Sequence, residues 1–370
     1  MNTKTVTLAL LAATLSLTTA QDDGFTPLFD GKTLAGWHNI NGAPSTWSVT
    51  ADGLLHCDGK PISALRTLRH YENFILELEW RHLKPRGNAG VFVWAAPITA
   101  TGQPFLRAVE VQVLENAFGN NASHTTHGDI FPIHGSTMKP FPPSRGQRSF
   151  PTEHLSKPSP QWNHYRITCN DGTIKLAVNG KQVSGGSGCS YRNGYIALES
   201  EGGVVDYRNI RIKELPSTGA APADTAPLFS GHQSIYNGVD LTGWAPQKTW
   251  STRDWNLVAS KNATPLSTLA SYTDIEVTCD FKLPEKITAD PRPAPASSRL
   301  AIDPTTFPEA RKGWNRAVVT VSGNHQSATL NGQPVAAYPP TPNTASGPLA
   351  LVPLTTGNAF ASIYIRPISE

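Results

Sequence analysis

The sequence predicts an all-β fold made of two sandwich or jelly-roll domains in tandem, the second a shortened copy of the first. Three observations lead to this prediction. The 31 prolines and 30 glycines are spread along the 370 residues, with no long helical periodicity between them. Short segments alternate apolar and polar residues, and they end at Gly, Asn or Asp turns. The same landmark residues also recur in the same order in both halves.

The predicted strands follow the period of two that is typical of half-buried antiparallel strands. Residues 74–80 and residues 165–169 both show this alternation, and residues 174–178 run into an Asn-Gly turn at 179–180. Short, closely spaced strands of this kind pack with their apolar faces inward. This packing favours a sandwich or jelly roll.

The repeat is visible in motifs that keep their order. Leu-Phe-Asp-Gly at 28–31 returns as Leu-Phe-Ser-Gly at 228–231, and the Trp-Asn pair at 162–163 returns at 314–315. Residues 216–227 lie between the copies and are rich in Pro, Ala, Ser and Thr, which is typical of a linker. We therefore predict a first domain over 21–215, a linker over 216–227 and a second domain over 228–370.

The amino terminus predicts export. Lys4 precedes an apolar run over residues 6–17, and small residues follow just before Gln21, which is typical of a signal peptide over residues 1–20. The run is too short to span a bilayer, and no later stretch reaches the roughly 20 apolar residues that a spanning helix needs. We expect a periplasmic or secreted protein without a membrane span.

Composition also excludes some partners and leaves the cysteines open. The net charge is only +3 and no basic run is present, so we expect no nucleic-acid partner. Cys57, Cys169, Cys189 and Cys279 lack the paired spacing of a zinc site. In an oxidising compartment Cys169 and Cys189 could form a disulfide, and isolated buried thiols are the alternative.

The two copies differ in length at one place, and this difference is the first indication of function. The stretch between the first two repeated landmarks, Leu28 and Trp162, is 48 residues longer than its counterpart between Leu228 and Trp314. Almost all of the excess lies between Trp80 and Trp162. A core needs its strands but not long loops, so the extra segment indicates an added function.

A polar strand is predicted inside the extra segment. Residues 109–113 alternate strictly, so their three valines point to one side and Glu110 and Gln112 point to the other. A carboxylate and an amide about 7 Å apart on one face suit the hydroxyls of a sugar ring. The alternative interpretation is an ordinary solvated outer face of an antiparallel sheet.

Histidines are concentrated after this strand. His124, His127, His134 and His154 lie close together in the chain, and Asp129 lies among them. Such enrichment is typical of proton transfer or of a divalent metal site, for which His127, Asp129 and His134 are the candidate ligands. The spacing matches no specific metal motif, and exposed loop histidines are the alternative interpretation.

A second acidic strand is predicted near the end of the first copy. Glu199 and Glu201 share one face of this strand, just before two glycines. Together with Glu110 they are candidates for acid, base or ligand roles, because glycoside cleavage commonly uses paired carboxyl groups with separated pKa values. The second copy has Leu-Val-Pro at 351–353 in the corresponding place, without a carboxylate.

These motifs together resemble the 3-keto-disaccharide hydrolase domain family over residues 24–215. The resemblance is carried, in order, by LFDGKTLAGW at 28–37, GNAGVF at 87–92, EVQV at 110–113, WNHYR at 162–166 and YRNIRI at 207–212. It implies a concanavalin A-like jelly roll and action on glycosides oxidised at C3. A ketone at C3 acidifies the C2 hydrogen, so a base can remove that proton while the oxygen on C1 leaves.

Residue roles follow in two groups. The resemblance implies that Glu110 and Gln112 lie on the polar concave strand of the family. The other assignments depend on position in this sequence. The candidate catalytic residues are Glu110, Glu201 and His134. The candidate substrate-binding residues are Gln112, Trp94, His127, Lys139, Arg148 and Glu199, and a divalent metal on His127, Asp129 and His134 is the only cofactor considered.

Three functions are compatible with this fold. The first is an exported enzyme that cleaves 3-keto-glycosides by hydrolysis or β-elimination, with an oligosaccharide or glycoside as substrate. The second is a non-catalytic carbohydrate-binding module, since the same jelly roll serves lectins. The third is a structural surface domain, which leaves the extra segment unexplained. Acidic and histidine residues outnumber aromatic ones in that segment, which favours chemistry over binding alone.

Overall fold

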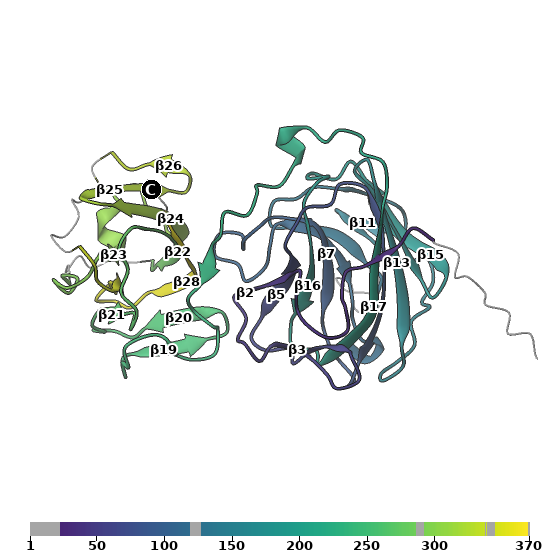
Figure 1. The fold of residues 1–370 in the computed structure, drawn as a ribbon, viewed down its shortest axis with the longest axis horizontal. Coiled ribbons are helices and arrows are strands. Elements are labelled where there is room, and N and C mark those ends of the chain that lie inside the picture. Colours follow the sequence, from purple (N-terminus) through teal and green to yellow (C-terminus); the bar gives the residue numbers. More distant parts are fainter. Residues whose placement is uncertain (1–22, 119–126, 286–291, 337, 339–344, 369–370) are drawn as a thin grey trace, which may run out of the picture.

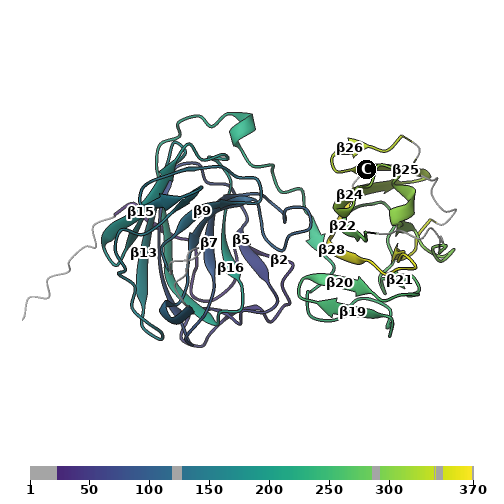
Figure 2. The same ribbon diagram turned by 180° about the vertical axis from the view of Figure 1, so that it is seen from behind.

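The computed structural model describes residues 23–118, 127–285, 292–336, 338 and 345–368. Two β-sandwiches lie side by side, and both Figure 1 and the reverse view in Figure 2 separate them clearly. The fold is all-β, as predicted. The predicted signal peptide at residues 1–20 and His124 both lie outside the described residues. Within the described ranges, no helix is long and apolar enough to cross a membrane.

The first sandwich is built from two sheets, which we call sheets A and B. In spatial order, sheet A contains β10 (Lys139–Pro140), β15 (Lys181–Ser187), β14 (Thr173–Val178), β13 (Asn163–Asn170), β6 (Phe74–His82), β17 (Val205–Glu214), β4 (Leu55–Cys57) and β3 (Trp47–Val49), with β1 (Thr26–Pro27) paired to β17. Sheet B contains β11 (Ser144–Arg145), β12 (Arg148–Ser149), β9 (Ile130–Ile133), β8 (Ala108–Gln112), β7 (Gly90–Ala95), β16 (Tyr195–Ser200), β5 (Ser63–Thr67) and β2 (Trp37–Ile40).

The second sandwich repeats the plan with fewer strands. Its larger sheet C contains β19 (Trp250–Arg253), β20 (Asn256–Ala259), β28 (Ala359–Pro367), β22 (Ile275–Leu283), β24 (Gly313–Ser322), β25 (His325–Leu330) and β26 (Gln333–Pro334), with β18 (Gln233–Ser234) paired to β28. Its smaller sheet D contains β21 (Leu266–Ser267), β27 (Leu349–Leu351) and β23 (Leu300–Ile302). Short 3-10 helices cover η1 (Asn116–Phe118), η2 (Pro222–Asp224) and η3 (Pro304–Thr306).

The extra segment of the first copy forms sheet rather than loop. It supplies strands β7 to β12, and five of these six strands belong to sheet B. In the corresponding stretch of the second copy, the described residues between β22 and β24 form only β23 and η3. The length difference therefore corresponds to about half of sheet B, which has no counterpart among the described residues of the second copy.

The core of the first sandwich lies between sheets A and B. Strand β8 shows how the pattern produces it: Val109 and Val111 are completely buried in this core, whereas Glu110 and Gln112 lie on the other face of sheet B. Strand β6 contributes Phe74, Leu76 and Leu78 from the opposite sheet. The predicted strand alternation is thus confirmed in both sheets.

A β-bulge changes the direction of Trp94. Tyr195 pairs with Ala95 but Ala197 pairs with Phe92, so β7 contains one extra residue here. Trp94 takes up the extra residue with a φ of 51°, and its indole is fully buried in the core. Its Nε1 donates to the carbonyl of Glu72 at 2.8 Å. The expectation that Trp94 contacts substrate is therefore wrong, because strict alternation does not hold across the bulge.

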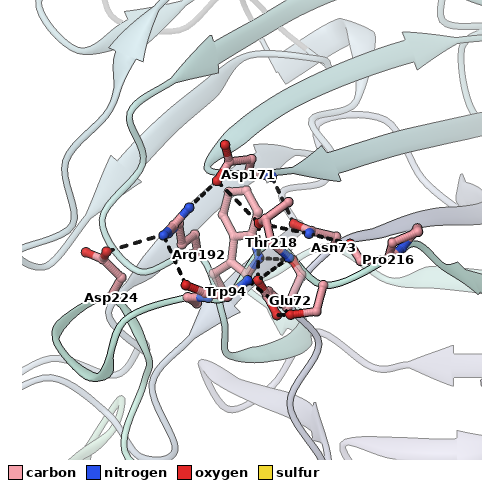
Figure 3. A network of polar contacts seen from close by, with 11 residues as sticks. Glu72, Asn73, Trp94, Asp171, Arg192, Pro216, Thr218 and Asp224 are labelled. Atoms are coloured by element: carbon pink, nitrogen blue, oxygen red, sulfur yellow. Dashed lines mark hydrogen bonds and ion pairs between the residues drawn. The ribbon is translucent and has the colours of Figure 1, made fainter.

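Residues 216–227, expected as a linker, are bound along the first sandwich. The side chain of Asn73 donates to the carbonyl of Pro216 at 2.8 Å, and the carboxylate of Glu72 accepts from the backbone of Thr218 at 3.0 Å (Figure 3). Further along, the backbone of Arg192 donates to the carbonyl of Asp224 at 2.8 Å. The network surrounds the edge at which Trp94 is buried (Figure 3).

All four cysteines are free and buried. Cys169 and Cys189 are thus free buried thiols rather than a disulfide, and they lie close enough for Cys189 to contribute to the raised pKa of Cys169. Burial raises the pKa of both groups above the usual range. Neither thiol is a reactive nucleophile under these conditions.

Candidate functional site

Carboxyl and amide groups from three neighbouring strands form one row on the outer face of sheet B. Gly90 on the central strand β7 pairs with Gln112 on β8. On the other side Val91 pairs with Leu198, so the next position along each strand brings Gly90 beside Glu199 on β16. Glu110 lies two residues before Gln112 and points to the same face. We call Glu110, Glu199 and Glu201 the carboxyl cluster.

Gly90 lies between two of these carboxyl groups. A Cβ placed on Gly90 would lie 3.0 Å from an oxygen of Glu110 and 3.0 Å from an oxygen of Glu199. The two carboxyl groups thus flank the same point in space, and the missing side chain leaves room for both. A residue larger than glycine would push them apart.

The row is not a solvated strand face. Glu110 is 6% exposed, Gln112 3% and Glu199 1%. Charged side chains are rarely buried to this extent unless they are paired or functional. The alternative interpretation of Glu110 and Gln112 as ordinary outward-facing polar residues is therefore wrong.

Amide groups connect the row to Glu201. The side chain of Gln112 donates to Oδ1 of Asn88 at 2.7 Å, and the side-chain nitrogen of Asn88 donates to a carboxyl oxygen of Glu201. Asn88 lies in the tight turn that leads into β7, and Glu201 directly follows β16. The chain of hydrogen bonds fixes the orientation of Glu201 relative to β8.

Burial shifts the titration of the carboxyl cluster into the neutral range. Burial, with a further contribution from the charge of Glu201, raises the pKa of Glu110 to about 8. Burial also raises the pKa of Glu201 to about 7, against the opposing effect of the Asn88 hydrogen bond. The pKa of Glu199 lies well above its usual value because of burial and the charges of Glu110 and Glu201. The cluster titrates as a unit and holds protons at neutral pH.

The positively charged side chain of Arg148 lies beside the carboxyl cluster. Arg148 on β12 donates to the buried carboxylate of Asp129 at 2.8 Å, and its guanidinium lies 3.5 Å from the ring centroid of Phe131. Phe131 is the cross-strand partner of Glu110. The positive charge of Arg148 lowers the pKa of Glu110 and so opposes burial in part. Arg148 and Asp129 therefore border the row, and the substrate-binding role of Arg148 stays a prediction.

His127 lies at the margin of this face. Its Nδ1 is hydrogen-bonded to the hydroxyl of Ser156, and its ring contacts that of His154 at a centroid distance of 5.9 Å. Burial, with the neighbouring His154, lowers the pKa of His127 to about 4. The imidazole is consequently neutral near pH 7 and is held by Ser156.

His134 lies at the opposite end of β9 from Asp129. It follows Ile133, which pairs with Ala108, and its ring stacks on Phe105 at a centroid distance of 6.3 Å. Burial lowers the pKa of His134. The structure gives it no contact with the carboxyl cluster among the described interactions, so its predicted catalytic role has no geometric support.

The predicted metal triad is not assembled. His127 is bonded to Ser156, Asp129 to Arg148, and His134 stacks on Phe105. In the part of the chain that the structure describes, no three His, Cys, Asp or Glu side chains are grouped to hold a metal ion. The three residues are close in the sequence, but strand β9 lies between His134 and the other two and keeps them apart in space.

Lys139 belongs to the other sheet. Strand β10 pairs with β15 at the edge of sheet A, where Lys139 is exposed opposite Ser187. It is therefore not brought to the row on sheet B. The residues that sequence reasoning missed are Asn88 and Gly90, both visible only as members of a tight Gly-Asn-Ala-Gly turn.

A family model described as "3-keto-alpha-glucoside-1,2-lyase-like domain" matches residues 24–213. A "3-keto-disaccharide hydrolase" of Bacteroides thetaiotaomicron is 24% identical over 249 residues, which cover 52% of this chain and 79% of that protein. Among solved structures, a candidate glycosyl hydrolase of Parabacteroides distasonis is 21% identical and covers 52% of this chain and 94% of its own, with a TM-score of 0.41. Carbohydrate-binding module CBM66 of Bacillus subtilis is 14% identical and covers 48% and 96%, with a TM-score of 0.34.

Proposed function

Since the chain belongs to the family of 3-keto-alpha-glucoside-1,2-lyase-like domains, we propose that its first sandwich cleaves glycosides that carry a ketone at C3. The family and the similar curated protein support a carbohydrate-related function, and the bond that is cleaved is the finer part of the proposal. The carboxyl cluster on sheet B is the proposed reaction site.

The observation that carries the proposal is the convergence of the carboxyl groups of Glu110, Glu199 and Glu201 at one place on sheet B, where burial raises their pKa values. A reaction that removes one proton and donates another needs an ionised base and a neutral acid together at one pH. Burial raises the pKa of Glu201 to about 7 and that of Glu110 to about 8, so near neutral pH the coupled cluster can hold an ionised and a neutral carboxyl group together. Ordinary surface carboxyl groups would all be ionised there.

The proposed chemistry begins with proton removal. The ketone at C3 acidifies the hydrogen on C2, and ionised Glu201 takes that proton. The electrons of the C2–H bond form a C1–C2 double bond while the C1–O bond breaks, and neutral Glu110 gives its proton to the leaving oxygen. The immediate products are an unsaturated keto-sugar and an alcohol. Addition of water across the double bond then gives the net hydrolysis product.

The remaining polar groups stabilise developing charge. Neutral Glu199 is the most buried member of the row and can donate a hydrogen bond to the C3 oxygen, on which negative charge develops as the C2 proton is removed. Gln112 and Asn88 hold Glu201 in place through their hydrogen bonds. The positive charge of Arg148, on the side of β12, limits how far burial raises the pKa of Glu110.

Export belongs to the same proposal. Residues 1–20 carry the features of a signal peptide, and glycosides outside the cytoplasm would be the available substrates. We propose a periplasmic or secreted location, which fractionation of the expressing cells tests directly.

The decisive experiment offers purified protein a 3-keto-disaccharide and its unoxidised parent. We expect cleavage of the keto-sugar alone, and a primary isotope effect when deuterium replaces the hydrogen on C2. Cleavage of the parent at an equal rate, or of the keto-sugar without any isotope effect or exchange at C2, contradicts the proposed proton removal. Binding of both sugars without turnover favours the lectin-like function. A parallel sample with chelator measures any metal requirement.

A further inference from the structure

The loop between β7 and β8 joins the two strands that carry the centre of the row. It covers residues 96–107 and closes on itself through backbone bonds from Ala96 to Arg107 at 2.9 Å and from Ala100 to Phe105 at 2.9 Å. Gly90 lies on the strand before it and Glu110 on the strand after it. Any change in the loop is therefore transmitted to both strands.

The tip of this loop is held by the second sandwich. The backbone of Gly102 donates to Oδ2 of Asp280 at 2.8 Å, and Nη2 of Arg316 donates to the carbonyl of Thr99 at 2.8 Å. The hydroxyl of Thr99 is bonded to those of Ser362 at 2.8 Å and Tyr364 at 3.0 Å. These partners lie on β22, β24 and β28, the central strands of sheet C.

An ion pair within the second sandwich holds Asp280 in position for this contact. Nε of Arg316 donates to Oδ1 of Asp280 at 2.7 Å, and the Asp280 side chain is fully buried. Nη2 of Arg316 also donates to Oδ2 of Asp280 at 2.9 Å, so this oxygen accepts hydrogen bonds from both Arg316 and the backbone of Gly102. A buried ion pair contributes little net stability but fixes geometry, because each unpaired alternative is costly.

Steric fit restricts the tip to one position. Gly102 has a φ of 66°, and a Cβ there would lie 2.2 Å from Cγ of Trp314. Trp314 is the first residue of the repeated Trp-Asn motif. Only glycine can both adopt this backbone conformation readily and approach the indole so closely.

The loop also connects to the row through side chains. Phe105 contacts Phe92 edge-on at a centroid distance of 5.9 Å, and Phe92 is the cross-strand partner of Glu110. Phe92 belongs to an apolar cluster on the outer face of sheet B that includes Tyr364 of the second sandwich. The apolar half of this face is thus covered by the second sandwich, directly beside the carboxyl cluster.

A further contact between the two sandwiches involves Phe229, which lies just after the linker region. The guanidinium of Arg66 on β5 lies 4.1 Å from the ring centroid of Tyr195 and 4.5 Å from that of Phe229. The backbone of Phe229 donates to the hydroxyl of Tyr195 at 2.7 Å. With the bound segment 216–227, these contacts hold the two sandwiches in one arrangement.

We propose that the second sandwich is a positioning module for the site on the first. Asp280, Arg316 and Trp314 hold the loop at residues 96–107 in one position. The loop in turn fixes the position of Glu110 relative to Gly90. These three are positioning residues, since they do not touch the carboxyl cluster. The part of the inference that concerns turnover rests on the function proposed above, whereas the mechanical coupling does not.

The test uses the full chain and two loop variants. Gly102→Ala places a methyl group against Trp314, and Thr99→Val removes the hydroxyl that bonds Ser362 and Tyr364 without changing its size. Arg366→Ala is the matched control, because it removes an ion pair with Glu276 on the same sheet C without touching the loop. Hydrogen exchange is measured at residues 108–112, and turnover of the 3-keto-disaccharide in parallel.

We expect exchange at residues 108–112 to accelerate about tenfold in both loop variants and to stay unchanged in Arg366→Ala. The turnover number should fall about tenfold with little change in KM, since the binding groups remain but their alignment is lost. Unchanged exchange at residues 108–112 in a folded loop variant overturns the proposal. If exchange accelerates in the loop variants but the wild-type protein cleaves no keto-sugar, the positioning role is supported. The proposed function is then the part that is wrong.

Discussion

The two sandwiches follow one plan but use opposite sheets. In the first, the proposed reaction site is on sheet B, whose outer face carries the carboxyl cluster. In the second, the equivalent sheet D has three strands, and β23 runs parallel to β27 where β7 runs antiparallel to β16. Sheet C, the counterpart of sheet A, instead provides the surface that holds the loop of the first sandwich.

Strand register shows what the second copy lacks. Leu65 pairs with Leu198 in the first sandwich, and Leu266 pairs with Leu351 in the second. The position of Glu199 is therefore taken by Val352 and that of Glu201 by Leu354, both buried. No strand corresponds to β8 among the described residues of sheet D. The comparison teaches that one sheet can lose its chemistry while the other keeps the framework.

The largest expected effect separates the two sandwiches by activity. Glu110→Gln should lower kcat/KM for the 3-keto-disaccharide by about 100-fold or more, because it removes the proposed acid. Glu309→Gln, at an exposed carboxylate of the second sandwich, should leave kcat/KM within about twofold, as expected for a surface change. Equal losses in both variants would break the assignment of chemistry to the first sandwich.

The next effect concerns stability and pH. A carboxyl group whose folded pKa is raised binds its proton more tightly in the folded state, so it destabilises the fold as pH rises from its unfolded value of about 4.5 to its folded value of about 8. Glu110→Gln should remove this effect. We expect the variant to gain on the order of 3 kcal/mol in unfolding free energy over wild type between pH 5 and pH 8.5.

Denaturant titrations at the two pH values measure this gain. Glu309→Gln again serves as the control, and its difference from wild type should not change with pH. A stability difference for Glu110→Gln that is the same at pH 5 and pH 8.5 would show that the group is not held neutral by burial.

A smaller effect is expected at Gly90. Gly90→Ala inserts a methyl group 3.0 Å from oxygens of both Glu110 and Glu199, so these carboxyl groups must separate. We expect about a tenfold fall in turnover number with a cooperative unfolding transition retained. Wild-type kinetics in a folded Gly90→Ala protein would indicate that the spacing of the two groups is not used in the reaction.

The smallest effect is expected at His134. His134→Ala removes a ring that stacks on Phe105 but does not reach the carboxyl cluster among the described interactions. Turnover should fall by less than about threefold, as for a packing change outside the site. A loss as large as that of Glu110→Gln would restore the histidine to the site and require a different approach of the substrate.

Alternation and repetition were sufficient to predict the architecture. The burial of Val109 and Val111 and the shared face of Glu110 and Gln112 follow from a period of two, which depends only on local backbone geometry. The repeated landmarks likewise predicted two related sandwiches. The nearness of β16 to β8 depends instead on strand order, and the sequence pattern holds no information on which strands become neighbours.

The errors have equally local causes. Trp94 was misassigned because one extra residue in β7 reverses its direction, and the sequence gives no sign of a bulge at this position. Lys139 and the metal candidates were grouped because they are close in sequence, although a strand run separates them in space. Gly90 acts through the absence of a side chain, which no residue-type search for reactive groups would find.

The bound segment 216–227 has a practical consequence for dissecting the protein. A fragment that stopped at residue 215 would strip partners from Glu72, Asn73 and Arg192 and open the edge beside Trp94 to water. Cutting after residue 227 instead preserves the bond from the backbone of Ala226 to the carbonyl of Asn193 at 2.8 Å. Expression trials of the isolated first sandwich should therefore keep the whole segment 216–227.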